Sequence, residues 1–292
     1  MMDKTKTTWT ISSILTWTKQ YFSEKGVDNP RLDAEVLLSR ILGKDRLYLY
    51  VNFDQPLQPA ELAAFRDAVK QRAARQPVAY IIGSKEFMGL KFKVSSAVLI
   101  PRPDTEILVE TAISRLEKIS KPRVLDIGTG SGAIIISVIA NLKSAQGAAV
   151  DISKEALAVA ADNAHSNGVA DRLEFYRGDL FNPVAGQKFD AILSNPPYIP
   201  NDDIAGLEPE VQREPKLALA GGKDGLDYYR RLIDQGSAYL EPGGFMALEV
   251  GIGQAASIAD LAKKNRLLQV TGIIKDYAGI DRVVVLEQRQ DN

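Results

Sequence analysis

The spacing of apolar residues divides the chain into a helical N-terminal part and a longer part with mixed elements. In residues 8–26 the apolar side chains recur at intervals of three and four, and the pattern stops at a glycine. Residues 29–43 repeat the pattern between an Asn-Pro start and a final glycine, and residues 59–76 repeat it between two prolines. The pattern predicts a small all-helical domain over residues 1–77.

Residues 78–100 have a different composition. They are rich in β-branched and aromatic side chains and contain glycines at positions 83 and 89, which is typical of a β-hairpin. We expect this hairpin to link the helical domain to the rest of the chain.

From residue 101 onward, short apolar runs alternate with segments of helical periodicity. Strands are expected at 123–128, 147–152, 173–179, 189–195, 243–250, 267–276 and 282–288. Helices are expected at 132–142, 153–168, 224–240 and 254–265. This alternation predicts an α/β fold with a mostly parallel sheet that is covered by helices on both faces. The last two strands are expected to form an antiparallel hairpin, which completes one domain over residues 101–292.

The composition excludes several kinds of site. The chain has 292 residues, a net charge of −1, no cysteine and a single histidine, His165. Disulfides, thiolate metal sites and cysteine nucleophiles are therefore excluded, and a multi-histidine metal site or a Ser-His-Asp triad lacks the necessary residues. His165 lies in a polar stretch at a predicted helix end, where we expect an ordinary solvated side chain. We expect no metal.

Charge and hydropathy also limit the partners. Nucleic-acid-binding proteins usually carry a basic excess, so the charge of −1 argues against a direct nucleic-acid partner. No apolar run reaches the ~18 residues of a membrane span, and the N-terminus lacks the apolar core of a signal peptide. We expect a monomeric, cytoplasmic protein that does not contact a membrane. The basic residues within 66–75 are either a partner surface or, as we favour, a solvated helix face.

A glycine-rich turn follows the first strand of the α/β part. The sequence LDIGTGSG places Asp126, Gly128, Gly130 and Gly132 between this strand and the next helix. Glycines in such a turn permit positive φ and let backbone N–H groups approach a ligand closely. The spacing G-x-G-x-G after an acid differs from the dinucleotide fingerprint G-x-G-x-x-G. Asp126 would repel a pyrophosphate, but it suits the cationic amino group of a methionine moiety.

Two further acids stand at the ends of the next two strands. Asp151 follows at roughly the ~20-residue interval at which an acid reaches a ribose hydroxyl in such folds. Asp179 ends the third strand, where an acid commonly meets the exocyclic amine of an adenine. A single Asp at such a place is often only a cap, but three acids at three strand ends indicate a pocket for S-adenosylmethionine. The pattern resembles the class I methyltransferases, which have a Rossmann-like fold.

The residues expected to line this cofactor pocket are Asp126, Gly128, Thr129, Gly130, Gly132, Asp151, Ile152, Asp179, Leu180 and Asn195.

The sequence SNPPY ends the fourth strand and therefore opens onto the same edge of the sheet. A planar nitrogen is a poor nucleophile because its lone pair is delocalised, so methyl transfer to it requires acceptors that hold both N–H bonds. The Asn195 side-chain oxygen and the Pro196 carbonyl can do this, Pro197 adds no competing N–H group, and Tyr198 can stack on the acceptor. The alternative is a proline-rich turn with Asn as cap and Tyr as packing. The motif itself does not distinguish a glutamine acceptor from an adenine.

Several segments together resemble one known family. LIPRPDTEILVE, VLDIGTGSGAI, VDIS, GDLF, SNPPYI and AGIDRVVVL are similar to segments of the bacterial release factor glutamine methyltransferases, the HemK or PrmC family. The resemblance covers almost the whole chain. It implies S-adenosylmethionine-dependent N5-methylation of the glutamine in the Gly-Gly-Gln motif of peptide chain release factors 1 and 2. It also implies that the helical domain helps to recognise the release factor.

The resemblance assigns the acceptor glutamine to the SNPPY segment. Asn195 and the Pro196 carbonyl would hold the amide, and Tyr198 would pack nearby as the third catalytic residue. Together with Pro197 these residues would form the substrate site.

The PRPDTE segment stays open between two interpretations. Arg102, Asp104 and Glu106 either fix a loop over the pocket or simply start a helix, since acids suit a first turn.

Three classes of alternative function are considered. The nearest alternatives methylate a glutamine of a ribosomal protein or N6 of adenine in a nucleic acid. A module that binds S-adenosylmethionine without catalysis would not need the orienting Asn195, and a nicotinamide dehydrogenase would bind a dinucleotide instead.

Overall fold

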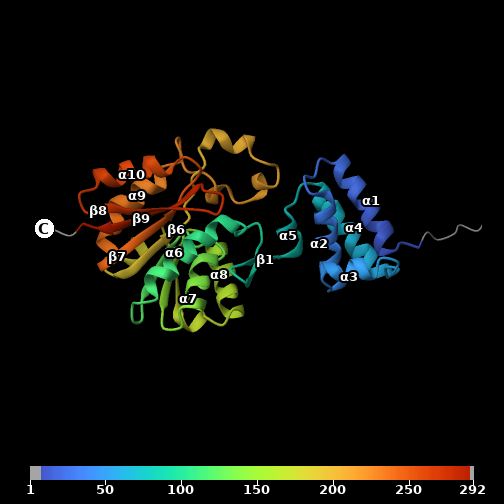
Figure 1. Ribbon diagram of the computed structural model, residues 1–292, viewed down its shortest axis with the longest axis horizontal. Coiled ribbons are helices and arrows are strands. Elements are labelled where there is room, and N and C mark those ends of the chain that lie inside the picture. The colour runs from blue at the N-terminus through green and yellow to red at the C-terminus, as the bar shows by residue number, and fades with distance from the viewer. Residues whose placement is uncertain (1–7, 290–292) are drawn as a thin grey trace, which may run out of the picture. The chain divides into compact units, whose positions relative to one another are not determined.

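The computed structural model describes residues 8–289, which form two compact units (Figure 1). The first, here called the helical unit, contains the chain up to Gly83 together with Pro209–Arg213. The second, the sheet unit, contains Ser84–Glu208 and the chain from Glu214 onward.

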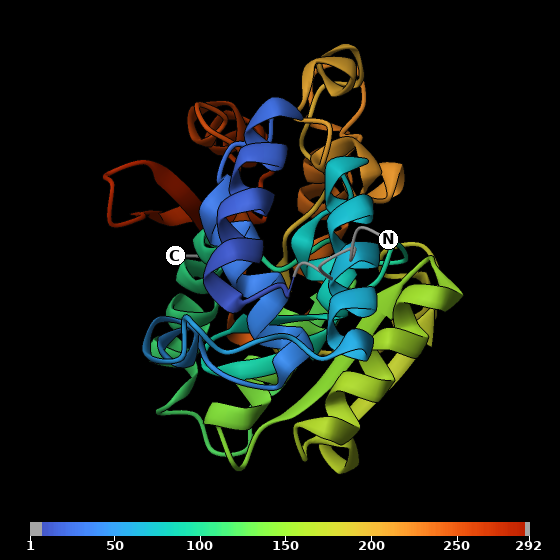
Figure 2. The ribbon, with the colours of Figure 1, turned by 90° about the vertical axis from the view of Figure 1, so that its right-hand side faces the viewer.

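The helical unit is a bundle of short helices. Its helices are α1 (Ile11–Glu24), α2 (Pro30–Leu42), α3 (Arg46–Val51), α4 (Pro59–Ala73) and α5 (Val78–Ile82). Both α1 and α4 pack beside α2, as the blue to cyan ribbons of Figure 2 show. Their apolar faces enclose Phe22, Leu38 and Phe65, which are fully buried. The predicted helices are present because each apolar stripe has a partner to cover it.

Two basic residues of the stretch 66–75 do not lie on a solvated face, Arg72 and the largely buried Arg75, which also pairs with Glu210. Arg72 is buried, and its guanidinium donates to Asp33 at 2.7 Å and pairs with Glu210 of the same unit. The segment Pro209–Arg213 supplies this second carboxylate from a distant part of the sequence, which helical periodicity alone cannot reveal.

The expected hairpin is shorter than the sequence pattern indicates. Residues Val78–Ile82 form α5, and only β1 (Ser84–Phe87) and β2 (Leu90–Lys93) pair as antiparallel strands. Pro77 precedes the helix, and Gly83 ends it with φ 77°, a left-handed conformation that glycine adopts without steric cost. Residues 78–82 therefore belong to the helical unit, and the start of the hairpin predicted at residue 78 is corrected to Ser84.

The sheet unit is built on a seven-stranded sheet. In chain order its strands are β3 (Arg123–Ile127), β4 (Gln146–Asp151), β5 (Leu173–Arg177), β6 (Phe189–Ser194), β7 (Leu240–Glu249), β8 (Leu268–Lys275) and β9 (Asp281–Gln288). Their spatial order is β5-β4-β3-β6-β7-β9-β8; the first five strands are parallel, and β9 is antiparallel to both β7 and β8. This confirms the predicted α/β fold and its C-terminal antiparallel pair.

Helices cover both faces of this sheet (Figure 1). They are α6 (Glu106–Leu116), α7 (Ala133–Asn141), α8 (Lys154–Ser166), α9 (Asp227–Gly236) and α10 (Ala255–Lys264). Side chains of α6 and α7 share one core with Ala191 and Leu193, whereas α9 and α10 share the opposite core with Ile192. Successive residues of β6 thus point to opposite faces, and both faces are apolar because both are covered.

The topology places a binding site at one edge of the sheet. The chain runs outward from β3 through β4 to β5, then returns to β6 on the other side of β3. Ligands of open α/β sheets bind at the carboxyl ends of the strands where the order reverses in this way. The segments that follow β3 and β6 are the two that meet there.

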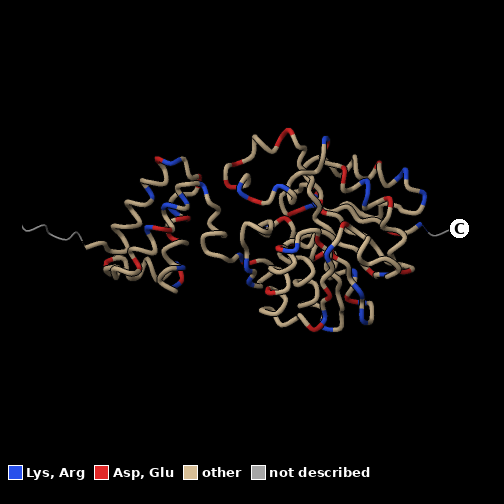
Figure 3. Tube along the Cα trace, turned by 180° about the vertical axis from the view of Figure 1, so that it is seen from behind, with Lys and Arg blue, Asp and Glu red and all other residues tan. Residues whose placement is uncertain are grey.

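The surface features of the described part agree with the composition. Along the described chain, lysine and arginine alternate with aspartate and glutamate in both units (Figure 3). Among residues 8–289 no helix has the length and apolar character needed to cross a bilayer, and no cluster of side chains suited to a metal ion occurs.

Candidate active site

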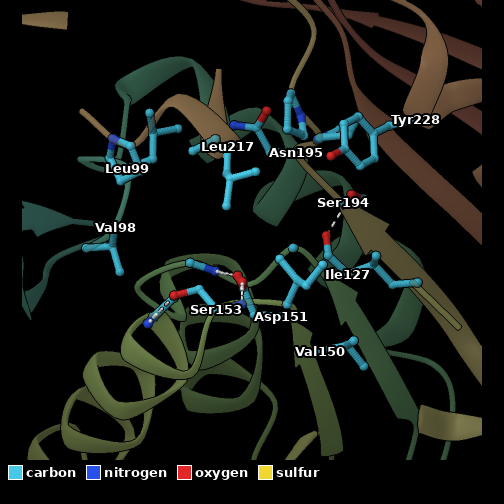
Figure 4. Close-up of a pocket in the computed structure, with 18 of the residues that line it drawn as sticks. Val98, Leu99, Ile127, Val150, Asp151, Ser153, Ser194, Asn195, Leu217 and Tyr228 are labelled. Carbon is cyan, nitrogen blue, oxygen red and sulfur yellow. Dashed lines mark hydrogen bonds between the residues drawn. The ribbon is translucent and has the colours of Figure 1, made fainter. Parts of the chain in front are cut away.

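A pocket of about 180 Å³ opens at the carboxyl ends of the central parallel strands (Figure 4). Its lining includes Gly128 and Gly130 after β3, Asp151 at the end of β4, Asp179 after β5 and Asn195 after β6. Four strand ends that are far apart in the sequence therefore meet around one cavity, as the sequence predicts.

The glycine turn forms one wall of this pocket. Gly128 and Gly130 have φ of 74° and 55°, and a Cβ added at either residue would meet no atom within 4 Å. Side chains there would enter open space at the pocket wall. Gly132 differs, since a Cβ would lie 2.7 Å from Cδ1 of Ile136. Gly132 thus lets the turn pack on α7, and it does not line the pocket.

Asp151 is held in a fixed orientation at the end of β4. Its Oδ2 accepts a hydrogen bond from the Gly130 N–H at 2.9 Å, and its Oδ1 accepts one from the Ser153 N–H at 2.9 Å (Figure 4). Each carboxylate oxygen keeps a further lone pair for a ligand hydroxyl. The adjacent Ile152 is about half exposed and also lines the cavity.

The segment after β5 contributes Asp179 and Leu180. Asp179 forms an ion pair with Arg231 of α9. Leu180 has φ of 47°, which is uncommon for a residue with a side chain. Both residues line the pocket.

The charge of the pocket lining has one sign. Its acidic residues are Asp151 and Asp179, and none of the described lining residues is a lysine, arginine or histidine. Such a lining disfavours a pyrophosphate or other polyanion and suits a cationic ligand. The dinucleotide alternative is therefore disfavoured.

The proline elbow forms the opposite wall. Asn195, Pro196 and Pro197 line the cavity, as predicted from SNPPY, but Tyr198 does not. The Tyr198 carbonyl accepts a hydrogen bond from Gln254 Nε2 at 2.9 Å, and burial raises the pKa of its phenol. Tyr228 of α9 provides the aromatic ring at the cavity instead (Figure 4).

Comparison with known proteins relates this geometry to a family. A release factor glutamine methyltransferase from Geobacter sulfurreducens is 48% identical over 277 residues, which cover 94% of this chain and 96% of the relative. Its counterpart from Moorella thermoacetica is 44% identical and covers 91% of this chain and 94% of the relative. The chain belongs to the release factor glutamine methyltransferase family.

Domain models agree with this membership, and solved structures agree with the fold. The PrmC N-terminal domain matches residues 13–83 and the methyltransferase small domain matches residues 103–206. The catalytic domain of hMettl16 superposes with a TM-score of 0.55 at 18% identity, over 77% of this chain and 83% of that one. A methyltransferase from Pyrococcus furiosus gives 0.50 at 19% identity, over 76% and 96%. At these identities the structures support the fold alone.

Two residues predicted to line the cofactor pocket of this methyltransferase lie beneath it. Asp126 is fully buried and accepts a hydrogen bond from the Thr129 hydroxyl at 2.7 Å, so the pair supports the glycine turn from behind. Burial, and then the charge of Asp151, raise the pKa of Asp126 to about 7, although the Thr129 hydrogen bond opposes the shift. The strand pattern placed Asp126 at the correct edge but did not reveal which way its side chain points.

The PRPDTE segment connects the pocket walls to the rest of the sheet unit. Arg102 pairs with Glu214, and Asp104 pairs with Arg282 at 2.8 Å. Glu106, at the start of α6, accepts a hydrogen bond from the Met88 N–H at 3.0 Å. These three side chains are engaged with protein groups, and Glu106 also begins α6 as an acid in its first turn. The choice between fixing a loop over the pocket and starting a helix therefore stays a prediction.

Sequence reasoning missed two residues behind Asn195. Thr105 is 4% exposed, and its Oγ1 accepts a hydrogen bond from Asn195 Nδ2 at 3.2 Å. Glu249 ends β7 and is 2% exposed. In the sequence, Thr105 could have been found by its place in PRPDTE. Glu249 could have been found as an acid at the end of an apolar strand.

Proposed function

We propose that this pocket binds S-adenosylmethionine and that the enzyme methylates N5 of the glutamine in the Gly-Gly-Gln motif of release factors 1 and 2. The observation that carries the proposal is the position of Asn195. It lies on the wall of the cavity that also holds Asp151 and Asp179, so an amide at Asn195 would be next to the cofactor.

The described lining fits the proposed cofactor. The open space beside Gly128 and Gly130 accepts a ligand against the backbone, and the fixed Asp151 suits ribose hydroxyls. Asp179 suits the adenine amine, and the Leu180 backbone lies beside it. Asp126 and Thr129 would act from below by holding the turn. When bound, the cofactor supplies an electrophilic methyl group on a cationic sulfonium, which a lining with carboxylates and without cationic side chains favours.

The elbow residues would orient the acceptor amide. Asn195 Oδ1 and the Pro196 carbonyl would each accept one N–H of the glutamine NH2, which fixes its plane and returns electron density to nitrogen. Pro197 has no N–H that could compete for these acceptors. After methylation the nitrogen releases a proton, so no base with a special pKa is required. Tyr198, which packs against the sheet core, would support the elbow from its buried side.

We assign recognition of the release factor to the helical unit. Leu47, Tyr50 and Val51 of α3 are 68%, 49% and 71% exposed, and their spacing places them on one face of the helix. Apolar side chains gathered on one exposed face are typical of protein–protein contact. We place the enzyme in the cytoplasm, where release factors act.

Mass spectrometry of methylated substrates tests the function. Full-length enzyme is incubated with S-adenosylmethionine and with release factor, ribosomal protein and DNA as competing substrates. We expect one added methyl group on the Gly-Gly-Gln glutamine of the release factor. Preferential methylation of the ribosomal protein or of adenine would refute the assignment, and no methylation of any substrate would refute catalysis.

A further inference from the structure

The side of Asn195 that faces away from the pocket is held by a buried polar group. Its Nδ2 donates a hydrogen bond to Thr105 Oγ1 at 3.2 Å, and Thr105 is nearly inaccessible to solvent. The carboxamide is planar, so its oxygen and nitrogen point in different directions. A donor that is engaged with Thr105 therefore turns Oδ1 away from Thr105.

Glu249 extends this arrangement across the next strand. Ser194 of β6 is in register with Leu248 of β7, so the residues that follow, Asn195 and Glu249, are neighbours. Burial raises the pKa of Glu249 to about 7, and hydrogen bonds from the Thr105 and Asn195 side chains oppose that shift. The carboxyl group of Glu249 therefore lies next to the side chains of both Thr105 and Asn195.

The surroundings of Glu249 do not provide a dedicated ion-pair partner. Arg282 lies nearby, but its guanidinium pairs with Asp276 and Asp104, both at 2.8 Å. One oxygen of Glu249, Oε2, has no hydrogen-bond partner among the described residues. A buried carboxyl group in this state is costly for folding, so its presence requires another explanation.

We propose that Thr105 and Glu249 are positioning residues that fix the orientation of the Asn195 carboxamide. The proposal rests on the proposed function, because a glutamine NH2 requires an acceptor at this place. A carboxamide rotated by 180° would present its own NH2 to the substrate, and two donors would then face each other. The Thr105 hydroxyl accepts from Asn195 Nδ2 at 3.2 Å. Its own proton would turn toward the neighbouring Glu249 carboxyl group, so that it could not serve a rotated carboxamide.

Conservative variants of Thr105 in the full-length enzyme test this proposal. Thr105→Val keeps the shape but removes the hydroxyl, and we expect kcat to fall about 10- to 100-fold, as for the loss of an orienting contact. The KM for release factor and the cofactor Kd, measured by calorimetry, should change less than about threefold. Thr105→Ser restores the hydroxyl and should restore kcat to within about threefold of wild type. Thr111→Val, which removes a hydroxyl bonded to the Ile107 carbonyl of α6, is the matched control.

Glu249 is tested with a pair of variants. Glu249→Gln keeps an oxygen that can accept from Thr105, so kcat should stay within about fivefold of wild type. Glu249→Leu removes that acceptor and should reproduce the loss seen in Thr105→Val. Combined with Thr105→Val, it should add little, because the two residues act on one group. Thermal melting identifies a variant that has not folded.

A readout without turnover separates this proposal from the proposed function. The Asn195 side-chain NH2 resonances, assigned by their loss in Asn195→Ala, should be slowly exchanging in wild type and Thr105→Ser. They should shift and exchange faster in Thr105→Val. Unchanged resonances, or equal kcat in the Thr105→Val and wild-type enzymes, would overturn the positioning role. If wild type methylates no release factor while the resonances respond as expected, the substrate assignment fails and the orientation of Asn195 stands.

Discussion

The two halves of the pocket wall are built on different physical principles. The donor half, which would face the methyl donor, consists of Gly128, Gly130, Asp151 and Asp179. It presents backbone groups and carboxylates from three strand ends. The acceptor half, which would face the acceptor amide, presents the carboxamide of Asn195, and the buried Thr105 and Glu249 lie behind it. The donor half can bind a ligand with local features alone. The acceptor half must instead hold one reactive geometry, and it therefore includes residues that are costly to bury.

The largest effect is expected at Asn195, because we propose that this residue holds the reacting amide in the transition state. Asn195→Ala should lower kcat about 10³-fold while the cofactor Kd changes little, since one oriented acceptor of the reacting group is lost. Single-turnover methylation and calorimetry measure the two quantities. Asn141→Ala, an exposed position at the end of α7, serves as the control. Turnover near that of wild type in Asn195→Ala would remove the distinction between the halves.

A matched pair of glycine variants isolates the donor half. Gly128 and Gly168 have φ of 74° and 69°, and a Cβ at either would meet no atom within 4 Å, but only Gly128 lines the pocket. Alanine at either position should cost about 1 kcal/mol of stability because of the left-handed backbone. Only Gly128→Ala should weaken the cofactor, about 10- to 100-fold in Kd by calorimetry. Equal affinities in both variants would show that the turn does not contact the ligand.

The pH dependence of the free energy of unfolding tests the burial of the carboxyl group behind Asn195. The pKa of Glu249 rises from 4.5 to about 7 on folding, so the native state binds more protons than the unfolded state between these values. The free energy of unfolding should therefore fall as pH rises from about 5 to 8, on the order of 2 kcal/mol from Glu249. Asp126 should act in the same direction, since its pKa also rises to about 7.

Urea unfolding of the enzyme without cofactor measures this slope. Glu249→Gln should show a smaller decrease in stability than wild type between pH 5 and 8. The exposed Asp171→Asn variant should keep the wild-type slope. A slope that is unchanged in Glu249→Gln would mean that this carboxyl group has the same affinity for protons in both states.

The smallest effect is expected at the ion pair of Asp179. Arg231 and Asp179 are 43% and 42% exposed at their side chains, and exposed pairs typically contribute less than about 1 kcal/mol. Arg231→Met should change the cofactor Kd by less than about fivefold. Higher salt should make the difference in Kd between this variant and wild type smaller still. A loss comparable to that of Gly128→Ala would assign Arg231 a direct role in binding.

The sequence predicted the donor half better than the acceptor half. Strand ends, glycines and acids are local signals, so the pattern correctly placed Asp151 and Asp179 at one edge of the sheet. The α/β fold and the family were confirmed by the structure and the relatives. Thr105, Asn195 and Glu249 lie far apart in the sequence, and their contact depends on the register of β6 with β7. The direction of a side chain could not be predicted from the sequence either, as the burial of Asp126 shows.

The monomeric state stays a prediction.

The five residues Pro209–Arg213 have a consequence for how the gene can be divided. Because they belong to the helical unit, the polypeptide enters that unit twice, and its fold is encoded by two separate stretches of DNA. A fragment that stops at codon 83 retains Arg72 and Asp33 but lacks Glu210, which leaves a buried guanidinium with one of its two carboxylates. Such a truncation would expose a surface that the intact protein covers. A module made by recombination at that boundary would therefore be less stable than the complete helical unit.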